Sequence, residues 1–226
     1  MAKANLTETT GSSITTNTSS ITYSHTNTGS FLVVCVGGQD NSNSTVTGIT
    51  YNGVSLTQVV NTTAREGASG TYRHSAIFYL ISPAQGAYNV VVSYGTTITT
   101  CASRAFSFTN VANVTPVDTS GQDAPTTQKN SGSISLTSSE KDYLFVDSIE
   151  VDNSSISAPS SPTRTNYYLI SDGGNSETMG FSYKTDVTKG TVAYIFPTDG
   201  GNRYLCYTGA IFKTVDFGGS FLYNLL

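Results

Sequence analysis

Short runs of apolar and β-branched residues recur along the whole chain, some alternating with polar residues and some standing as continuous apolar segments. None keeps the spacing of three to four residues that marks one face of a helix. Clusters of Gly, Asn, Asp and Ser, which are typical of turns, separate the runs. The pattern predicts an all-β fold, a jelly-roll-like antiparallel β-sandwich of about twelve strands. The expected strands cover residues 21–26, 31–36, 49–59, 75–82, 88–94, 102–108, 133–137, 143–151, 166–170, 178–184, 191–196 and 204–214.

The segment 49–59, ITYNGVSLTQV, carries the strongest hairpin signal. Its two arms alternate apolar and polar residues, and the pair Asn52-Gly53 lies between them. A two-residue turn of type I′ needs positive φ at both central positions, which Gly adopts freely and Asn more readily than most residues. The pair could instead present polar side chains to a ligand, but the turn signal is stronger. We therefore expect Asn52 and Gly53 to form a structural turn.

Two pairs of segments are alike between the first and second halves of the chain. FLVVCVGG at 31–38 resembles YLFVDSIE at 143–150, and CASRAFSF at 101–108 resembles CYTGAIFK at 206–213. An ancient duplication explains this likeness, and so does the shared composition of unrelated β-strands. Because each half has too few strands to cover both faces of a sheet alone, we expect a single domain over residues 21–215.

Charge and composition narrow the classes of function. Charged residues make up 12% of the chain, against ~25% in typical soluble domains, and the net charge is −4. Lys and Arg are scattered, so the basic patch of a nucleic-acid-binding protein is missing. No stretch approaches the ~18 apolar residues that span a membrane. The N-terminal segment has no apolar run, so either the chain acts from the cytoplasm in which it is made or a secretory signal has been removed.

The three cysteines, Cys35, Cys101 and Cys206, form no paired framework and no C-x-x-C motif. Their neighbours are apolar strand residues, among which a thiol behaves as a small hydrophobic side chain. We therefore expect three reduced, buried thiols.

Residues with catalytic potential are few. The two histidines, His25 and His74, lie at strand-edge positions, where a satisfied or exposed imidazole is expected more often than a general base. A glycosidase needs two carboxylates on one face at a defined separation, and Glu150 and Asp152 form the best such pair, with Asp147 on the opposite face of the same strand. Solvated acids at a strand exit explain this pair more simply. We expect no enzymatic activity and no cofactor.

Binding of sugar or metal receives limited support. The chain has no Trp to stack against a sugar ring, although four tyrosines could take that place: Tyr72, Tyr79, Tyr167 and Tyr168. The tetrapeptide Asp-Gly-Gly-Asn occurs at 172–175 and at 199–202. Because calcium takes six to eight oxygen ligands, two short loops supply too few unless they meet in space. We expect these loops to be turns and predict no metal site.

The two ends of the chain differ from the domain between them. Residues 1–20 are a polar, Ser/Thr-rich stretch, which we expect to form an N-terminal arm, and residues 118–130 are a candidate linker between the halves. Residues 216–226 form an apolar tail beyond Gly218-Gly219, whose hydrophobic members are Phe221, Leu222, Tyr223, Leu225 and Leu226. An end this apolar must cover its own core or bind a neighbour, so we expect the tail to be an interface.

The order of several motifs resembles a family of concanavalin/laminin-G-like jelly-roll sandwiches, which is common in phage virion proteins and bacterial surface proteins. The resemblance runs over residues 20–215 and is carried by turn and strand motifs rather than by a site. These motifs are TYNG at 50–53 with Leu56-Thr57, Phe78-Tyr79-Leu80, Pro83, Gly86, Phe108-Thr109-Asn110-Val111, Thr115-Pro116 and GAIFKTV at 209–215. The resemblance implies the fold, and implies function only by association.

We expect a non-enzymatic structural component of a phage virion, either a head decoration or a tail or fibre protein. Its partners would be other virion proteins and further copies of itself, and it would be assembled in the host cytoplasm. The alternative is a carbohydrate-binding or adhesive module of a bacterial surface protein, in which case a glycan is the partner and the cell surface is the location. A glycosidase that uses Glu150 and Asp152 is the third hypothesis.

Overall fold

The protein is an all-β, antiparallel structure. The computed structural model describes residues 2–66, 70–152, 156–159, 161–171, 177–198 and 201–215, and in these ranges it contains fifteen strands and no helix. The sequence pattern predicted about twelve. Two polar segments, 5–11 and 117–123, form edge strands that lack an apolar pattern of their own. The hairpin segment 49–59 contributes three strands instead of one, whereas 88–94 and 102–108 are parts of one long strand.

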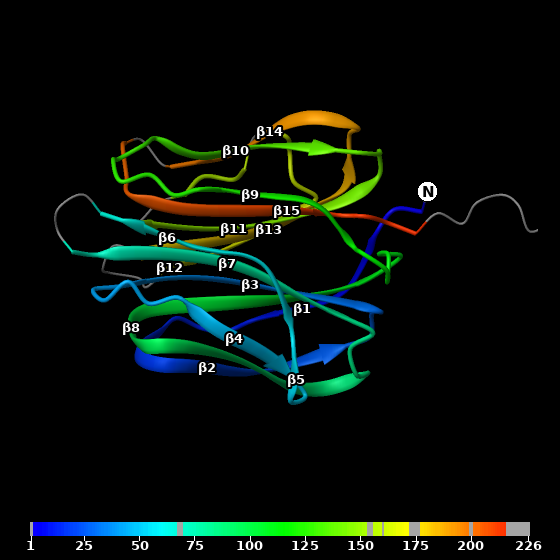
Figure 1. Ribbon diagram of the computed structural model, residues 1–226, viewed down its shortest axis with the longest axis horizontal. Helices are drawn as coiled ribbons and strands as arrows, with labels where there is room; N and C mark the ends of the chain where they lie inside the picture. Colours follow the sequence, from blue (N-terminus) through cyan, green and yellow to red (C-terminus); the bar gives the residue numbers. More distant parts are fainter. Residues whose placement is uncertain are drawn as a thin grey trace, which may run out of the picture.

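Figure 1 shows the strands in chain order. They are β1 (Asn5–Gly11), β2 (Thr15–Asn27), β3 (Phe31–Asp40), β4 (Val46–Tyr51), β5 (Val54–Ser55), β6 (Thr57–Arg65), β7 (Tyr72–Ile81), β8 (Gly86–Thr109), β9 (Val117–Asp123), β10 (Ser131–Ser138), β11 (Tyr143–Asp152), β12 (Asn166–Ser171), β13 (Glu177–Val187), β14 (Gly190–Pro197) and β15 (Leu205–Phe212).

The long strand β8 gives the first half of the chain its shape. Its first part pairs with β2 and β4, and its second part pairs with β1 and β3. Between Ser93 and Ile98, β8 advances five residues while its partner β2 advances only two, from Ser20 back to Thr18. Extra residues in one strand bend a sheet and increase its twist. The eight-stranded sheet, ordered β5-β4-β8-β3-β7-β6 with β1 and β2 also on β8, therefore curls until it is nearly closed.

The second half repeats this arrangement with separate strands. Its five-stranded sheet is ordered β12-β13-β11-β15-β9, which matches β6-β7-β3-β8-β1, and the pair β10-β14 takes the place of β2 and the first part of β8. The similar sequences at 31–38 and 143–150 lie on the central strands β3 and β11, and those at 101–108 and 206–213 lie on their neighbours. The repeated strand order favours duplication over chance likeness.

The two large sheets pack face to face, and each has a second core on its other face (Figure 1). Between the sheets, Phe31 of β3 meets Phe212 of β15 with ring centroids 5.2 Å apart. The curled part of the first sheet covers Leu32 and Val34, and the β10-β14 pair covers Phe145. Strands β3, β11 and β15 are thus buried on both faces. This explains their continuous apolar sequences, since alternation requires one face in water.

At one point the two sheets approach closely enough for side chains to reach the opposite backbone. Ser148 Oγ of β11 donates to the Val36 carbonyl of β3 at 2.9 Å, and Ser75 Oγ of β7 donates to the Ser148 carbonyl at 2.9 Å. A Cβ on Gly37 would lie 3.0 Å from Met179 Cγ, so even a methyl side chain there would require Met179 to shift. Small residues therefore set the spacing between the halves.

Both chain segments expected to lie outside the sheets contain strands. Residues 5–11 form β1 and residues 15–20 begin β2, so the polar stretch before Ile21 belongs to the curled sheet rather than to a separate arm. The expected linker overlaps β9, which pairs with β15. Thr- and Ser-rich segments become strands here because each finds an open edge with which to pair. The apolar tail at 216–226 lies outside the described residues.

The Asn52-Gly53 pair connects β4 to β5. Its residues have φ values of 50° and 74°, and the flanking residues Tyr51 and Val54 are paired across the hairpin. Positive φ at both positions is the geometry of a type I′ turn. A Cβ on Gly53 would meet nothing within 4 Å, so the turn requires this glycine for its backbone conformation and not for space.

Replacing Gly53 with Val should lower the free energy of unfolding by ~1–2 kcal/mol, because a β-branched residue adopts positive φ poorly. Urea denaturation followed by circular dichroism measures the change. The substitution Gly48→Ala in the adjoining strand is the control, since its backbone is not in the left-handed region. Equal stability of wild type and the Gly53 variant would contradict the turn assignment.

Candidate functional site

Of the acidic residues singled out in the sequence, Asp147 and Glu150 are buried and Asp152 is half-buried. Glu150 and Asp152 share the face of β11 that meets the first half, as expected, but Glu150 is 0% exposed rather than solvated. Arg73 of β7, itself 3% exposed, donates from one Nη to Glu150 at 2.6 Å and to Glu177 of β13 at 2.5 Å. Its other Nη lies 3.2 Å from Glu66. The first sheet covers this end of β11, which removes the solvent exposure predicted for a strand exit.

One guanidinium serves three carboxylates in this cluster. Burial raises the pKa of Glu150 well above its usual value, and the nearby Glu177 adds to the rise, while Arg73 opposes it. Partial burial also raises the pKa of Asp152. Burial opposes the charge on Arg73, yet its carboxylate partners raise its pKa overall. The sequence did not point to Arg73, although an Arg within the apolar run TYRHSAIFY is itself a sign of a buried ion pair.

Asp147 faces the opposite side of β11 and binds a second arginine. Arg164 donates to Asp147 Oδ2 from Nε at 3.1 Å and from Nη2 at 2.7 Å, and Tyr207 donates to the same oxygen at 2.7 Å. Ser182 donates to the other carboxylate oxygen. The side chains of Arg164 and Asp147 are both 0% exposed. This buried pair holds the loop before β12 against the core that the β10-β14 pair covers. Both oxygens of Asp147 accept hydrogen bonds, so neither is available to act as a base.

His25 lies in a Ser-His-Asn arrangement that does not fit nucleophilic catalysis. Its Nε2 is 2.7 Å from Ser107 Oγ, and Ser107 donates to Asn27 Oδ1 at 2.6 Å. Because the hydroxyl proton goes to Asn27, Ser107 accepts from the histidine and is not activated by it. All three residues are 0% exposed. The group stabilises the curled sheet from within.

His74 is buried as well, on the opposite face of β7 from Arg73. Its ring packs over Gly38, where an added Cβ would lie 2.3 Å from His74 Cε1, and lies edge-on to Tyr94 with centroids 5.3 Å apart. Neither ring nitrogen has a hydrogen-bond partner. Burial lowers the pKa of His74 to about 3 and that of His25 to about 4. Both histidines were expected at strand edges, and the curl of the sheet is what encloses them.

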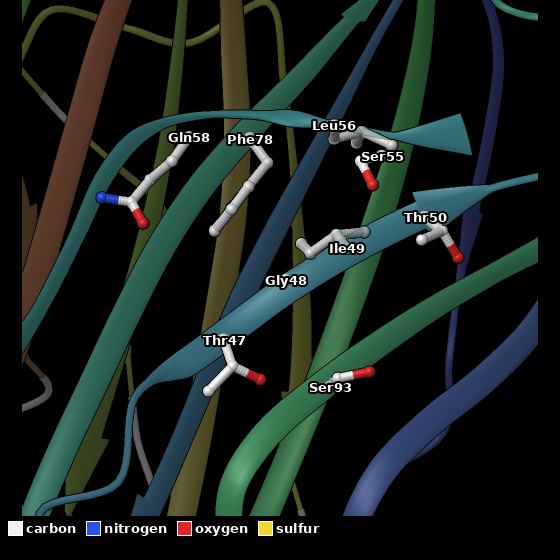
Figure 2. A pocket seen from close by; sticks show the side chains of 9 residues that line it. All are labelled: Thr47, Gly48, Ile49, Thr50, Ser55, Leu56, Gln58, Phe78 and Ser93. Carbon is white, nitrogen blue, oxygen red and sulfur yellow. The ribbon is translucent and has the colours of Figure 1, made fainter. Parts of the chain in front are cut away.

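The open surface carries a groove beside the hairpin, with a volume of about 490 Å³. Figure 2 shows Phe78 between β4 and β6, with Thr47 and Gln58 at one end of the groove and Thr50 and Ser55 at the other. The remaining lining residues are Gly48, Ile49, Leu56 and Ser93. The segment with the hairpin signal therefore forms the turn and also lines the groove through its arms.

The groove exists because the curled sheet does not quite close. The edges of β4 and β6 are joined at one end, where the Leu56 amide donates to the Ile49 carbonyl at 2.8 Å, and at the other, where Asn61 Nδ2 donates to the Val46 carbonyl at 2.7 Å. Between these points both strands are irregular, with register shifts next to Gly48 and next to Gln58. Bulges on facing edges keep the strands apart.

The chemistry of the groove is that of an uncharged polar surface. Its lining offers the hydroxyls of Thr47, Thr50, Ser55 and Ser93 and the amide of Gln58 above a small apolar floor, without a charged residue. This arrangement suits a neutral ligand that both donates and accepts hydrogen bonds.

The tyrosines proposed as sugar platforms lie elsewhere. Tyr79 stacks on Phe31 at 5.4 Å, and Tyr168 lies beneath Arg104, whose Cζ is 3.9 Å from the ring centroid. Tyr167 is 44% exposed on β12, and Tyr72 begins β7. None of the four lines the groove.

Within the described ranges, no three His, Cys, Asp or Glu side chains are grouped so as to hold a metal ion. The first Asp-Gly-Gly-Asn loop lies outside the described residues, as does the start of the second. Thr198 Oγ1 donates to the Gly201 carbonyl at 2.7 Å, and Gly201 and Asn202 line a pocket of about 500 Å³ with Asn130 and Thr198. The three cysteines are free and buried, as predicted.

Among the residues that the structure describes, no helix is long and apolar enough to cross a membrane. Compared with protein-family models, with curated proteins and with solved structures, the chain gives no match. The function must therefore be inferred from the sequence and from the geometry of the fold.

The buried His74 should make the protein sensitive to acid. Because its pKa is about 3 in the folded state and 6.5 otherwise, the unfolded chain takes up a proton first as pH falls. Stability present above pH 6.5 is then lost by about 1.4 kcal/mol per pH unit down to pH 3. His74→Leu should flatten the loss between pH 6.5 and 4 in urea titrations. Parallel curves for the variant and the wild type would contradict this assignment.

Proposed function

We propose that the chain is a non-enzymatic structural component of a phage virion, a head decoration or a tail or fibre protein with a jelly-roll-type β-sandwich fold. The observation that carries the proposal is how the chain uses its charged and catalytic side chain types. Arg73 with Glu150, Arg164 with Asp147, and both histidines all lie inside, where they join layers of the fold. These acidic, basic and imidazole side chains could support catalysis in an open site, but here they pack between strands.

The architecture and the surface support the same proposal. Two similar halves that share a buried interface form a continuous body of stacked sheets, which suits a load-bearing part better than a hinged enzyme. The chain has few charges, and the resemblance to virion jelly rolls spans most of its length. The protein would then act through contacts with other proteins, and copies of the same chain are the simplest partners.

The apolar C-terminal residues are the proposed contact with those partners, namely Phe221, Leu222, Tyr223, Leu225 and Leu226. They lie outside the described residues. The last described residue, Val215, is tied to the body of the protein, because its amide donates to Asn110 at 3.0 Å and its carbonyl accepts from Ala2 at 3.2 Å. The described part of the chain thus ends at a fixed anchor, and eleven residues follow it in the sequence, 216–226.

Deleting residues 217–226 should leave the melting temperature of the isolated protein nearly unchanged and abolish self-association or attachment to particles. Burying five large apolar side chains contributes ~1.5–3 kcal/mol each before the cost of ordering, which is enough to decide association. Size-exclusion chromatography with light scattering measures the oligomer, and co-sedimentation with purified heads and tails measures attachment.

A control variant changes only the two glycines that precede the apolar residues, with Gly218 and Gly219 both replaced by Ser. It should associate like the wild type, because the apolar side chains remain. A large drop in melting temperature of a monomeric truncated protein, with particle attachment preserved, would show that the tail serves its own core.

A second candidate function, glycan binding in an adhesive module, is favoured by the groove between β4 and β6. A neutral sugar presents the donors and acceptors that its hydroxyl and amide lining could satisfy. Gly48 offers a clean test, because a Cβ there would meet nothing within 4 Å and its φ is outside the left-handed region. A larger side chain at this position would fill the groove without straining the fold.

On an array of neutral oligosaccharides, Gly48→Val should therefore lose any binding that the wild type shows, with an unchanged melting temperature. Thr22→Val is the matched control, because it introduces the same side chain at an exposed position of β2 that does not line the groove. This variant should bind normally. Binding that survives in the Gly48 variant would place the sugar elsewhere, and a wild type that binds none of the sugars would exclude this alternative for them.

A further inference from the structure

The cluster around Arg73 joins the two halves of the chain. Arg73 belongs to β7 of the first half, whereas Glu150 and Glu177 belong to β11 and β13 of the second. Both contacts cross the interface between the large sheets. The cross-sheet hydrogen bond from Ser75 to Ser148 lies two residues away along both strands. The cluster is therefore placed where it can hold the sheets together or let them part.

The charges in the cluster do not balance if every acid is ionised. One guanidinium faces Glu66, Glu150 and Glu177, with Asp152 close by. Glu150 Oε2 and Arg73 Nε are buried without a hydrogen-bond partner. An ionised carboxylate with a bare, buried oxygen is costly, whereas a neutral carboxyl carries its proton there at lower cost.

The groups that face Glu150 come from every element packed against it. Besides the acids and Arg73, β15 contributes Cys206, which is paired with Glu150 in register, and β13 contributes the uncharged Met179. Gly37 of β3 adds only backbone, since a Cβ there would lie 3.6 Å from Glu150 Cβ. Apart from Arg73, none of these groups is a cation. Among the described residues that face it, a negative charge on Glu150 has Arg73 as its one counter-charge.

We infer that this cluster is a proton-dependent clasp between the two halves, in which a proton on Glu150 keeps the large sheets together at this end and its loss lets them separate. The separation is local, because the contact of Phe31 with Phe212 elsewhere between the sheets has no ionisable group.

The direction of the pH effect follows from the raised pKa of Glu150. An acid whose pKa is higher in the folded state stabilises that state fully below its ordinary pKa, here 4.5, and this contribution is lost as pH rises through the folded value. The clasp therefore opens toward alkaline pH, opposite in direction to the acid sensitivity of the histidines.

The native thiols report the opening without an added probe. Cys206 lies in the interface beside Glu150, with Sγ 3.5 Å from the Thr62 carbonyl. Cys35 lies in the same inter-sheet core but is paired with Ile77, four positions along β7 from Arg73. Cys101 belongs to the core of the curled sheet. Alkylation with iodoacetamide, read for each cysteine by peptide mass spectrometry, compares the three sites within one molecule.

Between pH 6 and pH 9, the labelling rate of Cys206 relative to Cys35 should rise by about tenfold or more in the wild type. The open population increases up to about tenfold for each pH unit over which Glu150 holds its proton only in the closed form. The ratio cancels the increase in reactive thiolate that both cysteines share as pH rises. Glu150→Gln, which mimics the neutral acid, should keep the ratio flat. Glu177→Gln removes a negative neighbour and lowers the pKa of Glu150, so its rise should begin at lower pH.

Three results would overturn the inference. One is a constant ratio in the wild type, and another is the same rise in Glu150→Gln as in the wild type. The third is a parallel increase for all three cysteines, which indicates global unfolding. If Glu150→Gln fails to fold, the direction of the shift in Glu177→Gln decides, because a rise that begins at the same or higher pH contradicts the clasp.

Discussion

The face-to-face contact between the eight-stranded sheet and the five-stranded sheet is the constraint on which the rest of the structure depends. Each sheet already has a core on its outer face, so its central strands have no side left for water. A polar group on them that finds no partner within the protein costs about 1–3 kcal/mol, because it is buried without a hydrogen bond. Residues such as Ser75 and Ser148 meet this requirement by bonding across the interface.

The buried charged residues help to set how the sheets align with one another. A buried ion pair often adds little net stability, but an unpaired buried charge is strongly unfavourable. Arg73 can therefore be accommodated only if the sheets align it with Glu150 and Glu177, and Arg164 only if its loop reaches Asp147. Both pairs favour one relative position of the packed layers. Hydrophobic contact alone is less directional and would allow the layers to shift relative to one another. The cost of this specificity is a dependence on protonation at Glu150.

The two candidate functions use different parts of the molecule. The proposed role in a virion relies on a rigid double body and on residues 221–226 beyond its anchor at Val215. The alternative relies on the groove where the curled sheet stops short of closure, between β4 and β6. The halves differ at this point, because the described residues of the second half include no counterpart of β4 and β5. A feature present in one copy only is a reasonable place for an added function.

The sequence by itself determined the strands of the core, the turn at Asn52-Gly53 and the likeness of the halves. These depend on local chemistry: alternation or apolar runs for strands, and tolerance of positive φ for the turn. Only the tertiary structure decided that residues 5–11 form a strand, that Glu150 is buried, and that Arg73 is its partner. A polar segment becomes a strand only where an open edge accepts it, and the environment of Glu150 is set by a sheet that comes from the other half of the chain.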